Sequence, residues 1–295
     1  MRDQAARLRE LLNKENNVNK NKTAKKKRKT KVIAVTSGKG GVGKTNFTIN
    51  LAYSLINLGF KVLVFDADIG FANVDVLLGI MPKYNIADVL HGEKKLLDII
   101  EKGPGGLEII SGGSGIHDIM RLENHKIEYI LNQFYQIEDY ADYLLIDTGA
   151  GLSNTVFNFV NSADEVIVVT TPEPTSLTDA YAMMKALTMN NEGLKMKLVV
   201  NRVEDEKDAL DVYYKLKRVI QRFLSIELDF LGYIYDSKHI IESVKNQMPL
   251  LMEQPNSNVA KKFNSIALKL IGNDTDSENQ GISHFIDNLK RFFKR

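Results

Sequence analysis

The segment "KVIAVTSGKGGVGKTNFTINLAYSLIN", residues 31–57, joins an apolar run to a glycine-rich loop and then to a helical pattern. The loop contains the spacing G-x-x-x-x-G-K-T, which ends at Gly43, Lys44 and Thr45. Glycines in such a loop let backbone N–H groups wrap around phosphate oxygens, with the N-terminus of the next helix behind them. A strand before the loop and a helix after it are the context that makes the motif reliable. The segment therefore predicts a phosphate-binding βα unit.

The predicted phosphate loop contains a second lysine that phosphate binding alone does not require. Lys44 supplies the fixed positive charge of the motif, and the Thr45 hydroxyl is placed to bind Mg²⁺. Lys39 stands where a small residue suffices, so it either points into solvent or has a separate role. We expect the nucleotide to be bound by Gly38, Lys39, Gly40, Gly41, Val42, Gly43, Lys44, Thr45 and Asn46.

Apolar runs alternate with helical patterns along the rest of residues 31–272. The runs "KVLVFDAD", "GLEIIS", "YLLIDTG", "EVIVVTT", "KMKLVVN" and "LDFLGYIY" are mostly too apolar to have a solvent-exposed face, which is typical of strands in a parallel sheet. Helical spacing is found at 46–57, 127–137, 177–189 and 209–223. The pattern predicts a doubly wound α/β fold with helices on both faces. Ligands bind at the carboxyl ends of such strands, where "SGKGGVGKT", "DADIG", "DTGAG", "TTPEPT" and "NRV" fall.

Aspartates end two of these apolar runs. Asp66 and Asp68 stand close together and would repel each other unless a cation or a positive loop lay beside them. Asp147 has the form of a Walker B carboxylate, which holds Mg²⁺ through water. Gly149 and Gly151 after it permit a loop that responds to a γ-phosphate. Together these residues predict a site for ATP or ADP with Mg²⁺.

The composition excludes several other classes of protein. The chain of 295 residues has no cysteine, which removes disulfides, thiolate zinc sites and thiol nucleophiles. It has no apolar run of about eighteen residues or more and no signal peptide, so we expect it in the cytoplasm. Residues 1–31 hold 12 Lys/Arg against 3 acids, and residues 282–295 hold 4 against 1. Because the whole chain carries only +2, the body between them carries about −10 and is poorly suited to nonspecific DNA binding.

This patterning divides the chain into five segments. We expect an N-terminal helical element at 1–14, a basic linker at 15–30 that is too polar to fold, and the nucleotide-binding domain at 31–272. A polar tether at 273–281 and an amphipathic helix at 282–295 follow. The alternative for residues 1–14 is a frayed terminus whose helical periodicity is accidental.

The motif K-G-G-x-G-K-T after a first strand resembles the deviant Walker A of the MinD/ParA group of P-loop ATPases. In that group the second lysine reaches across an ATP-sandwich dimer, so Lys39 is expected to stabilise the transferring phosphate of the partner. The resemblance also implies that Asp68 positions or activates the attacking water and that Asp66 acts in the magnesium shell or holds the loop. The implied catalytic residues are Lys39, Lys44 and Asp68, and the implied metal residues are Thr45, Asp66 and Asp147.

Two further loops resemble the adenine side of the same site. Asn201 in "VVNRV" is the implied amide partner of the base, and Arg202 is a flanking contact. "TTPEPT" belongs to the same side by resemblance. An asparagine after a strand is often only a turn former, which is the alternative for Asn201.

Within this group the chain resembles the FlhG (YlxH) ATPases, which regulate flagellar number and position. The most specific feature is "DQAARLR", because FlhG proteins use an N-terminal D-Q-A-x-x-L-R element to engage the GTPase FlhF and stimulate its GTP hydrolysis. The matching residues, and the implied partner contacts, are Asp3, Gln4, Ala5, Leu8 and Arg9. "DADIGFANVDVLLG" and "TTPEPTSLTDAYAMMK" also fit this branch better than a plasmid partition ATPase.

The last residues, "GISHFIDNLKRFFKR", form a helical pattern with one apolar and one basic face. This is typical of a helix that lies in a membrane interface, and the polar tether would let it leave the body. The alternative is a C-terminal helix docked on the core. The expected membrane-contacting residues are Ile282, Phe285, Ile286, Leu289, Phe292 and Phe293.

The function implied is a slow, dimer-dependent ATPase that uses Mg²⁺, closes into a homodimer with ATP and attaches reversibly to the cytoplasmic membrane at sites of flagellar assembly. Expected partners are FlhF, membrane lipid and flagellar C-ring proteins, with no specific nucleic acid. The alternatives are a MinD regulator of the cell-division site, which lacks the N-terminal motif, and a ParA-type DNA partition ATPase, which the acidic body opposes. A metabolic kinase is a weaker third reading, because no set of substrate-binding residues is evident.

Overall fold

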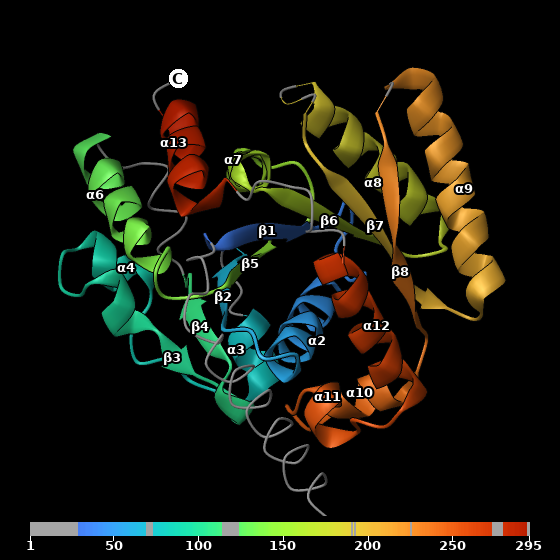
Figure 1. Ribbon diagram of the computed structural model, residues 1–295, viewed down its shortest axis with the longest axis horizontal. Helices are drawn as coiled ribbons and strands as arrows, with labels where there is room; N and C mark the ends of the chain where they lie inside the picture. The colour runs from blue at the N-terminus through green and yellow to red at the C-terminus, as the bar shows by residue number, and fades with distance from the viewer. Residues whose placement is uncertain are drawn as a thin grey trace, which may run out of the picture.

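The computed structural model describes residues 29–68, 73–113, 124–189, 191, 193–224, 226–272 and 280–293. The strands that it describes form one eight-stranded sheet in the order β3-β4-β2-β5-β1-β6-β7-β8 (Figure 1). The pairing of β3 with β4 is antiparallel, and the other pairs are parallel. The predicted doubly wound, mostly parallel α/β fold is confirmed. The strands are β1 (Lys31–Thr36), β2 (Val62–Ala67), β3 (Glu101–Lys102), β4 (Glu108–Ser111), β5 (Tyr143–Thr148), β6 (Glu165–Thr170), β7 (Met196–Val203) and β8 (Leu228–Tyr235).

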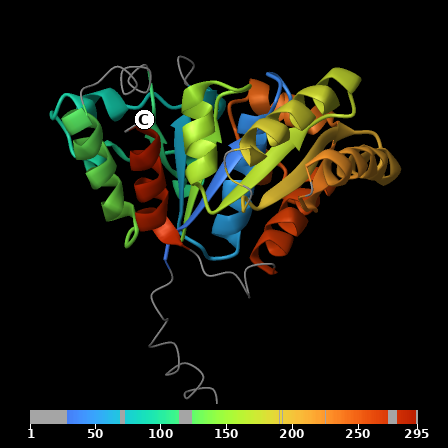
Figure 2. The ribbon, with the colours of Figure 1, turned by 90° about the horizontal axis from the view of Figure 1, so that it is seen from above.

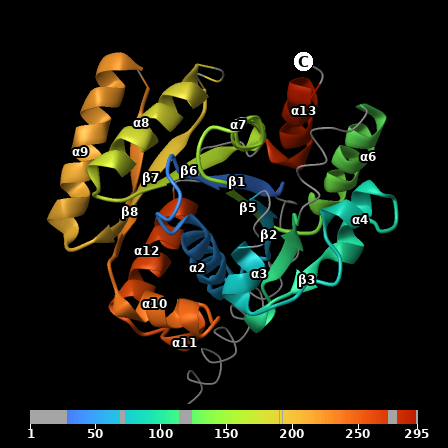
Figure 3. The ribbon, with the colours of Figure 1, turned by 180° about the vertical axis from the view of Figure 1, so that it is seen from behind.

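Helices cover both faces of the sheet, as Figures 1 and 3 show from opposite sides. One face is covered by α2 (Lys44–Asn57), α3 (Asn73–Leu78), α11 (Leu250–Glu253) and α12 (Asn258–Gly272), and α10 (Lys238–Lys245) packs against α11 on the same side. The other is covered by α4 (Ile86–Leu90), α6 (Asn124–Phe134), α7 (Asn154–Ser162), α8 (Pro174–Thr188), α9 (Glu206–Phe223) and α13 (Gly281–Phe293). Strands β1, β2, β5 and β6 are buried along their whole length, which explains their uniformly apolar sequences.

Helices α2, α6, α8 and α9 each begin two or three residues before the predicted ranges. The apolar periodicity starts only in the second half of the first turn, because the first residues are polar or are caps. Helix α9, for example, is capped by the Asp205 side chain, which accepts a hydrogen bond from the Asp208 N–H at 2.8 Å. For these four helices the differences lie at the boundaries. Helices α3, α4, α10, α11 and α12 and strand β3 lie outside the predicted ranges, and they leave the predicted fold class unchanged.

Helix α13 is docked on the body between α6 and α7, beside β1 (Figure 2). The side chains of Ile282, Phe285, Ile286 and Leu289 are no more than 1% exposed. The Phe285 ring stacks on Phe159 with centroids 6.4 Å apart. The apolar face that the sequence offered to a membrane is therefore part of the core here, which is the docked arrangement that the sequence left open. Phe292 is partly exposed, and the side chain of Phe293 lies outside the described residues.

The N-terminus of α13 is held by a carboxylate that follows the helical turn Tyr135–Ile137. The Ile282 N–H donates a hydrogen bond to Glu138 Oε2 at 2.6 Å. Burial raises the pKa of Glu138, and the bond from Ile282 opposes that rise. Gly281 has φ 81°, and a Cβ there would lie 2.5 Å from Glu138 Oε1. The glycine therefore permits both the left-handed turn into the helix and the close approach of Glu138.

The remaining predicted segments lie outside the described residues. These are the N-terminal element, including Asp3, Gln4, Ala5, Leu8 and Arg9, nearly all of the basic linker and most of the polar tether. Their proposed roles stay predictions. None of the helices that the structure describes is long and apolar enough to cross a membrane.

Candidate functional site

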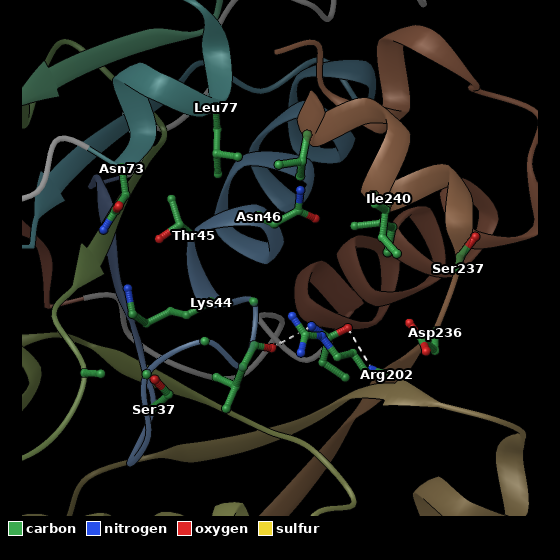
Figure 4. Close-up of a pocket in the computed structure, with 18 of the residues that line it drawn as sticks. Ser37, Lys44, Thr45, Asn46, Asn73, Leu77, Arg202, Asp236, Ser237 and Ile240 are labelled. Atoms are coloured by element: carbon green, nitrogen blue, oxygen red, sulfur yellow. Dashed lines mark hydrogen bonds between the residues drawn. The ribbon is translucent and has the colours of Figure 1, made fainter. Parts of the chain in front are cut away.

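A cavity of about 860 Å³ opens at the carboxyl ends of the strands, between the glycine-rich loop, α3 and α10 (Figure 4). It brings together side chains from β1, β2, β7 and β8, as expected for a doubly wound sheet. Of the predicted nucleotide-binding residues, it is lined by Gly40, Gly41, Val42, Gly43, Lys44, Thr45, Asn46, Asn201 and Arg202. Asp68 also lines it.

The glycine-rich loop adopts a backbone that side chains would strain. Gly41 has φ 77° and Gly43 has φ 88°, both in the left-handed region. Gly38 does not line the cavity, and a Cβ on it would lie 2.2 Å from the Asp179 backbone in α8. The role of Gly38 in this structure is thus to let α8 approach the loop, whereas the other glycines shape the loop itself.

Asn201 braces this loop. Its Nδ2 donates to the Val42 carbonyl at 2.7 Å, and its Oδ1 accepts from the Arg202 N–H at 3.0 Å. A Cβ on Gly43 would lie 2.5 Å from the same Nδ2. Both ends of the Asn201 amide are therefore already hydrogen-bonded within the protein. The contact with a base that the resemblance implied for this residue stays a prediction.

Asp147 is fully buried and accepts hydrogen bonds from three residues at the start of α2. Its Oδ1 accepts from Lys44 Nζ at 2.9 Å and from Thr48 Oγ1 at 3.0 Å, and its Oδ2 accepts from Thr45 Oγ1 at 2.6 Å. A hydroxyl and a carboxylate at the mouth of a phosphate loop are the oxygen donors that Mg²⁺ prefers. The predicted metal residues Thr45 and Asp147 are therefore adjacent and fit that ion. Thr48, one helical turn after Lys44, was not identified from the sequence.

Asp66 is a second buried carboxylate, 1% exposed, beside Asp147 on the neighbouring strand. Burial, and then the negative charge of Asp147, raise the pKa of Asp66 to about 8, against hydrogen bonds from the Asp68 and Val74 N–H groups. Those bonds measure 3.1 and 3.2 Å. Burial and the charge of Asp147 therefore favour the protonated form of Asp66, and a bound cation would favour its ionised form. Its backbone bonds place it as a support for the loop that carries Asp68.

Asp68 is a half-buried carboxylate that lines the cavity. Asn73 Nδ2 donates to its Oδ2 at 2.8 Å. Burial raises the pKa of Asp68, and the positive charge of Lys44 lowers it. A Cβ on Gly149 would lie 2.9 Å from Asp68 Oδ1, so the loop after β5 passes directly beside this carboxylate. The predicted water-positioning residue and the predicted switch loop thus meet, with Asn73 as a further partner that the sequence did not indicate.

Lys39 points away from the cavity of its own chain. Its Nζ lies 2.9 Å from Glu173 Oε2 and 3.0 Å from Thr175 Oγ1, at the start of α8. The lysine lowers the pKa of Glu173. Both side chains of this ion pair are partly exposed, at 39% and 60%. The pair is therefore accessible to solvent and is expected to exchange partners readily.

The far wall of the cavity comes from the end of β8 and from α10. It consists of Tyr235, Asp236, Ser237, Ile240, Ile241, Val244 and Lys245. Ser237 also caps α10 by accepting a hydrogen bond from the His239 N–H at 3.2 Å. The sequence analysis identified β8 but did not place its carboxyl end at the site. Applying the strand-end rule to "LDFLGYIYDS" would have found these residues.

Comparisons with known proteins agree with this geometry. The ParA family model, described as "NUBPL iron-transfer P-loop NTPase", matches residues 28–271. The flagellum site-determining protein YlxH of Helicobacter pylori is 39% identical over 299 residues, which cover 100% of this chain and 98% of YlxH. The antiactivator FleN of Pseudomonas aeruginosa is 39% identical over 239 residues, which cover 81% of this chain and 85% of FleN. The septum site-determining protein MinD of Pyrococcus horikoshii, solved with Mg-ADP, matches with a TM-score of 0.67 and 28% identity over 84% of this chain and 100% of that one.

Proposed function

Because the chain belongs to the ParA family of P-loop NTPases, and within it to the FlhG (YlxH) branch, we propose that it is a MinD-type ATPase that regulates flagellar number and placement. The observation that carries the ATPase part of the proposal is a phosphate loop with two lysines of different orientation, and the flagellar part follows the relatives YlxH and FleN. Lys44 is paired with Asp147 inside the cavity, and Lys39 is turned out to Glu173. Lys44 would bind a phosphate of the nucleotide held by its own chain, and Lys39 would leave Glu173 to reach the nucleotide of a second chain.

In the proposed cycle a monomer binds ATP with Mg²⁺, which Thr45 and Asp147 would hold. The ion would neutralise phosphate charge. Lys44 exchanges part of its pairing with Asp147 for a phosphate oxygen, and Asp68 orients the attacking water. Lys39 leaves Glu173 and contacts the nucleotide of a second copy, which completes both sites. Hydrolysis and dissociation of the dimer then reset the switch.

The regulatory role is tested in the cell. Deleting the gene is expected to change the number and position of flagella, because the proposed switch would be lost. Complementation with the wild-type gene should restore the normal pattern, whereas Lys44→Ala, which removes the phosphate-binding charge, should not. Flagella are counted by electron microscopy, and immunoblots check that both proteins accumulate equally. Normal flagellation in the deletion strain would contradict the proposed function.

Membrane attachment is proposed to depend on release of α13. The helix carries Lys290 and Arg291 beside its apolar face, and a single helix of this length is expected to bind lipid weakly. Two such helices on one ATP-bound dimer would bind far more tightly, because the second contact is intramolecular. Nucleotide state would thereby determine location.

Changing Phe292→Glu with Phe293→Glu is expected to abolish co-sedimentation with anionic vesicles in Mg-ATP while leaving ATP binding intact. Two carboxylates on the apolar face oppose insertion and repel anionic headgroups. Leu268→Glu is a suitable control, because Leu268 is 57% exposed on α12, which covers the opposite face of the sheet. Equal sedimentation of the double variant and the wild type would leave α13 as a permanently docked core helix.

The N-terminal element is proposed to stimulate a GTPase of the FlhF type. A peptide of residues 1–14 should by itself raise GTP hydrolysis by the cognate FlhF, and Gln4→Ala should weaken the effect. The basic linker would add only reach and local concentration. A peptide of the same composition in scrambled order is the control. If saturating peptide leaves the GTPase rate unchanged, this segment has no such activity.

A further inference from the structure

The second half of α9 carries an exposed face that is basic and aromatic, unlike the acidic body around it. No acid occurs between Val212 and Leu224, whereas this stretch contains Lys215, Lys217, Arg218 and Arg222. The opposite face of the helix is buried against β7 and β8. Tyr214 is 56% exposed, Val219 37% and Phe223 63%. We define these four basic and three apolar residues as the α9 patch.

The basic residues of the patch form no salt bridge within the described part of the chain. Lys217 lies over the Tyr213 ring and Arg222 over the Phe223 ring, but Lys215, Arg218 and Arg222 form no ion pair with any carboxylate that the structure describes. Basic residues near a helix C-terminus offset the helix dipole, but that effect is confined to about the last turn. It accounts for Arg222 and leaves Lys215 and Arg218 unexplained. It also gives no reason for an exposed phenylalanine.

The position of the patch suits a planar partner. Helices α13, α7, α8 and α9 lie in one layer over the same face of the sheet (Figure 1). Helices α8 and α9 pack together, and each returns antiparallel to its strand, so both end at the sheet edge opposite the nucleotide cavity. Met189, just after α8, is 77% exposed at that edge. A dimer formed across the two phosphate loops would leave this corner uncovered.

We propose that the α9 patch is a second membrane contact, which binds anionic phospholipid headgroups through Lys215, Arg218 and Arg222 while Val219 and Phe223 enter the interface. The proposal rests on the membrane attachment argued above and adds a second site to it. Basic side chains close to an anionic membrane are attracted to its surface potential, and bulky apolar side chains beside them are buried at the acyl boundary. A duplex nucleic acid offers the same negative charge but no apolar layer for Phe223, so lipid is the better fit.

The test compares the wild type with Lys215→Gln, Arg218→Gln and Arg222→Gln combined. The control combines Lys83→Gln, Lys95→Gln and Lys102→Gln, which remove three exposed charges near the other edge of the sheet. Full-length proteins in Mg-ATP are sedimented with phosphatidylglycerol-containing or pure phosphatidylcholine vesicles, and their binding to a short DNA duplex is measured. Unfolding midpoints and ATP binding should match in all three proteins, because the α9 patch lies away from the nucleotide cavity.

The α9 variant is expected to partition into anionic vesicles at least about tenfold less than the wild type. The control should partition like the wild type, and no protein should bind pure phosphatidylcholine strongly. If the α9 variant sediments like the wild type but the variant at Phe292 and Phe293 does not, only the present inference is overturned. If the wild type itself does not bind anionic vesicles, both membrane proposals fail. If the α9 variant loses DNA binding but binds vesicles like the wild type, the α9 patch is a nucleic-acid site and the proposal of a lipid contact is overturned.

Discussion

A Lys39→Ala protein is expected to bind ATP as tightly as the wild type, to remain monomeric, and to hydrolyse ATP on the order of 10³-fold more slowly. Binding should survive because Lys39 lies on Glu173 and Thr175 and does not line the cavity of its own chain. Dimerisation and turnover should be lost because the charge proposed to reach the partner's phosphates is missing. Nucleotide fluorescence, light scattering and phosphate release measure the three quantities.

Glu173→Gln is the matched control for this experiment. It removes the carboxylate that holds Lys39 at the start of α8 and keeps the lysine itself. We expect this protein to dimerise with ATP at least as readily as the wild type, since Lys39 no longer has to leave an ion pair. A Lys39→Ala protein that forms a normal ATP dimer would show that the lysine does not act across the interface.

Asp68→Ala is expected to trap the ATP-bound dimer and to lower hydrolysis by about 10²- to 10⁴-fold. The carboxylate lines the cavity beside the loop of Gly149, where a water could be oriented toward a γ-phosphate. Light scattering after incubation with Mg-ATP should show a dimer that persists over hours, when the wild type has returned to monomer.

Asn73→Ala gives a graded comparison. It removes the hydrogen bond that orients Asp68 Oδ2 and leaves the carboxylate in place. Its loss of rate should be smaller than that of Asp68→Ala, because the reacting group is kept and only its positioning is weakened. Wild-type turnover by Asp68→Ala would remove this residue from the proposed chemistry.

The sequence predicted the fold because the decisive signals are local. Buried parallel strands must be apolar along their length, and the phosphate loop needs glycines at fixed spacing. These rules located Lys44, Thr45 and Asp147. In the structure Lys44 and Thr45 both donate hydrogen bonds to Asp147, at 2.9 and 2.6 Å. Spacing of this kind can be read from a short stretch of sequence without knowledge of the fold.

The missed features depend on contacts between distant residues. Glu173 meets Lys39 across 134 positions, and Asn201 meets Val42 across 159. No periodicity in either stretch indicates the other. The pattern of the C-terminal helix favoured a membrane interface and left a docked helix as the alternative. The site between α6 and α7 that receives the helix is formed by distant parts of the chain, so no local pattern shows it.

If α13 is released as proposed, its docked position would make membrane attachment depend on two inputs at once. Its four fully buried apolar side chains correspond to roughly 6–12 kcal/mol of burial, an upper estimate at about 1.5–3 kcal/mol each. That is comparable with the whole stability of a typical domain, about 5–15 kcal/mol. Neither a nucleotide alone nor a lipid surface alone easily offsets such a cost, and an undocked helix would leave Phe159 bare and prone to aggregation. Only nucleotide and lipid together would make release of α13 favourable. The protein would therefore stay off the membrane wherever one of them is missing.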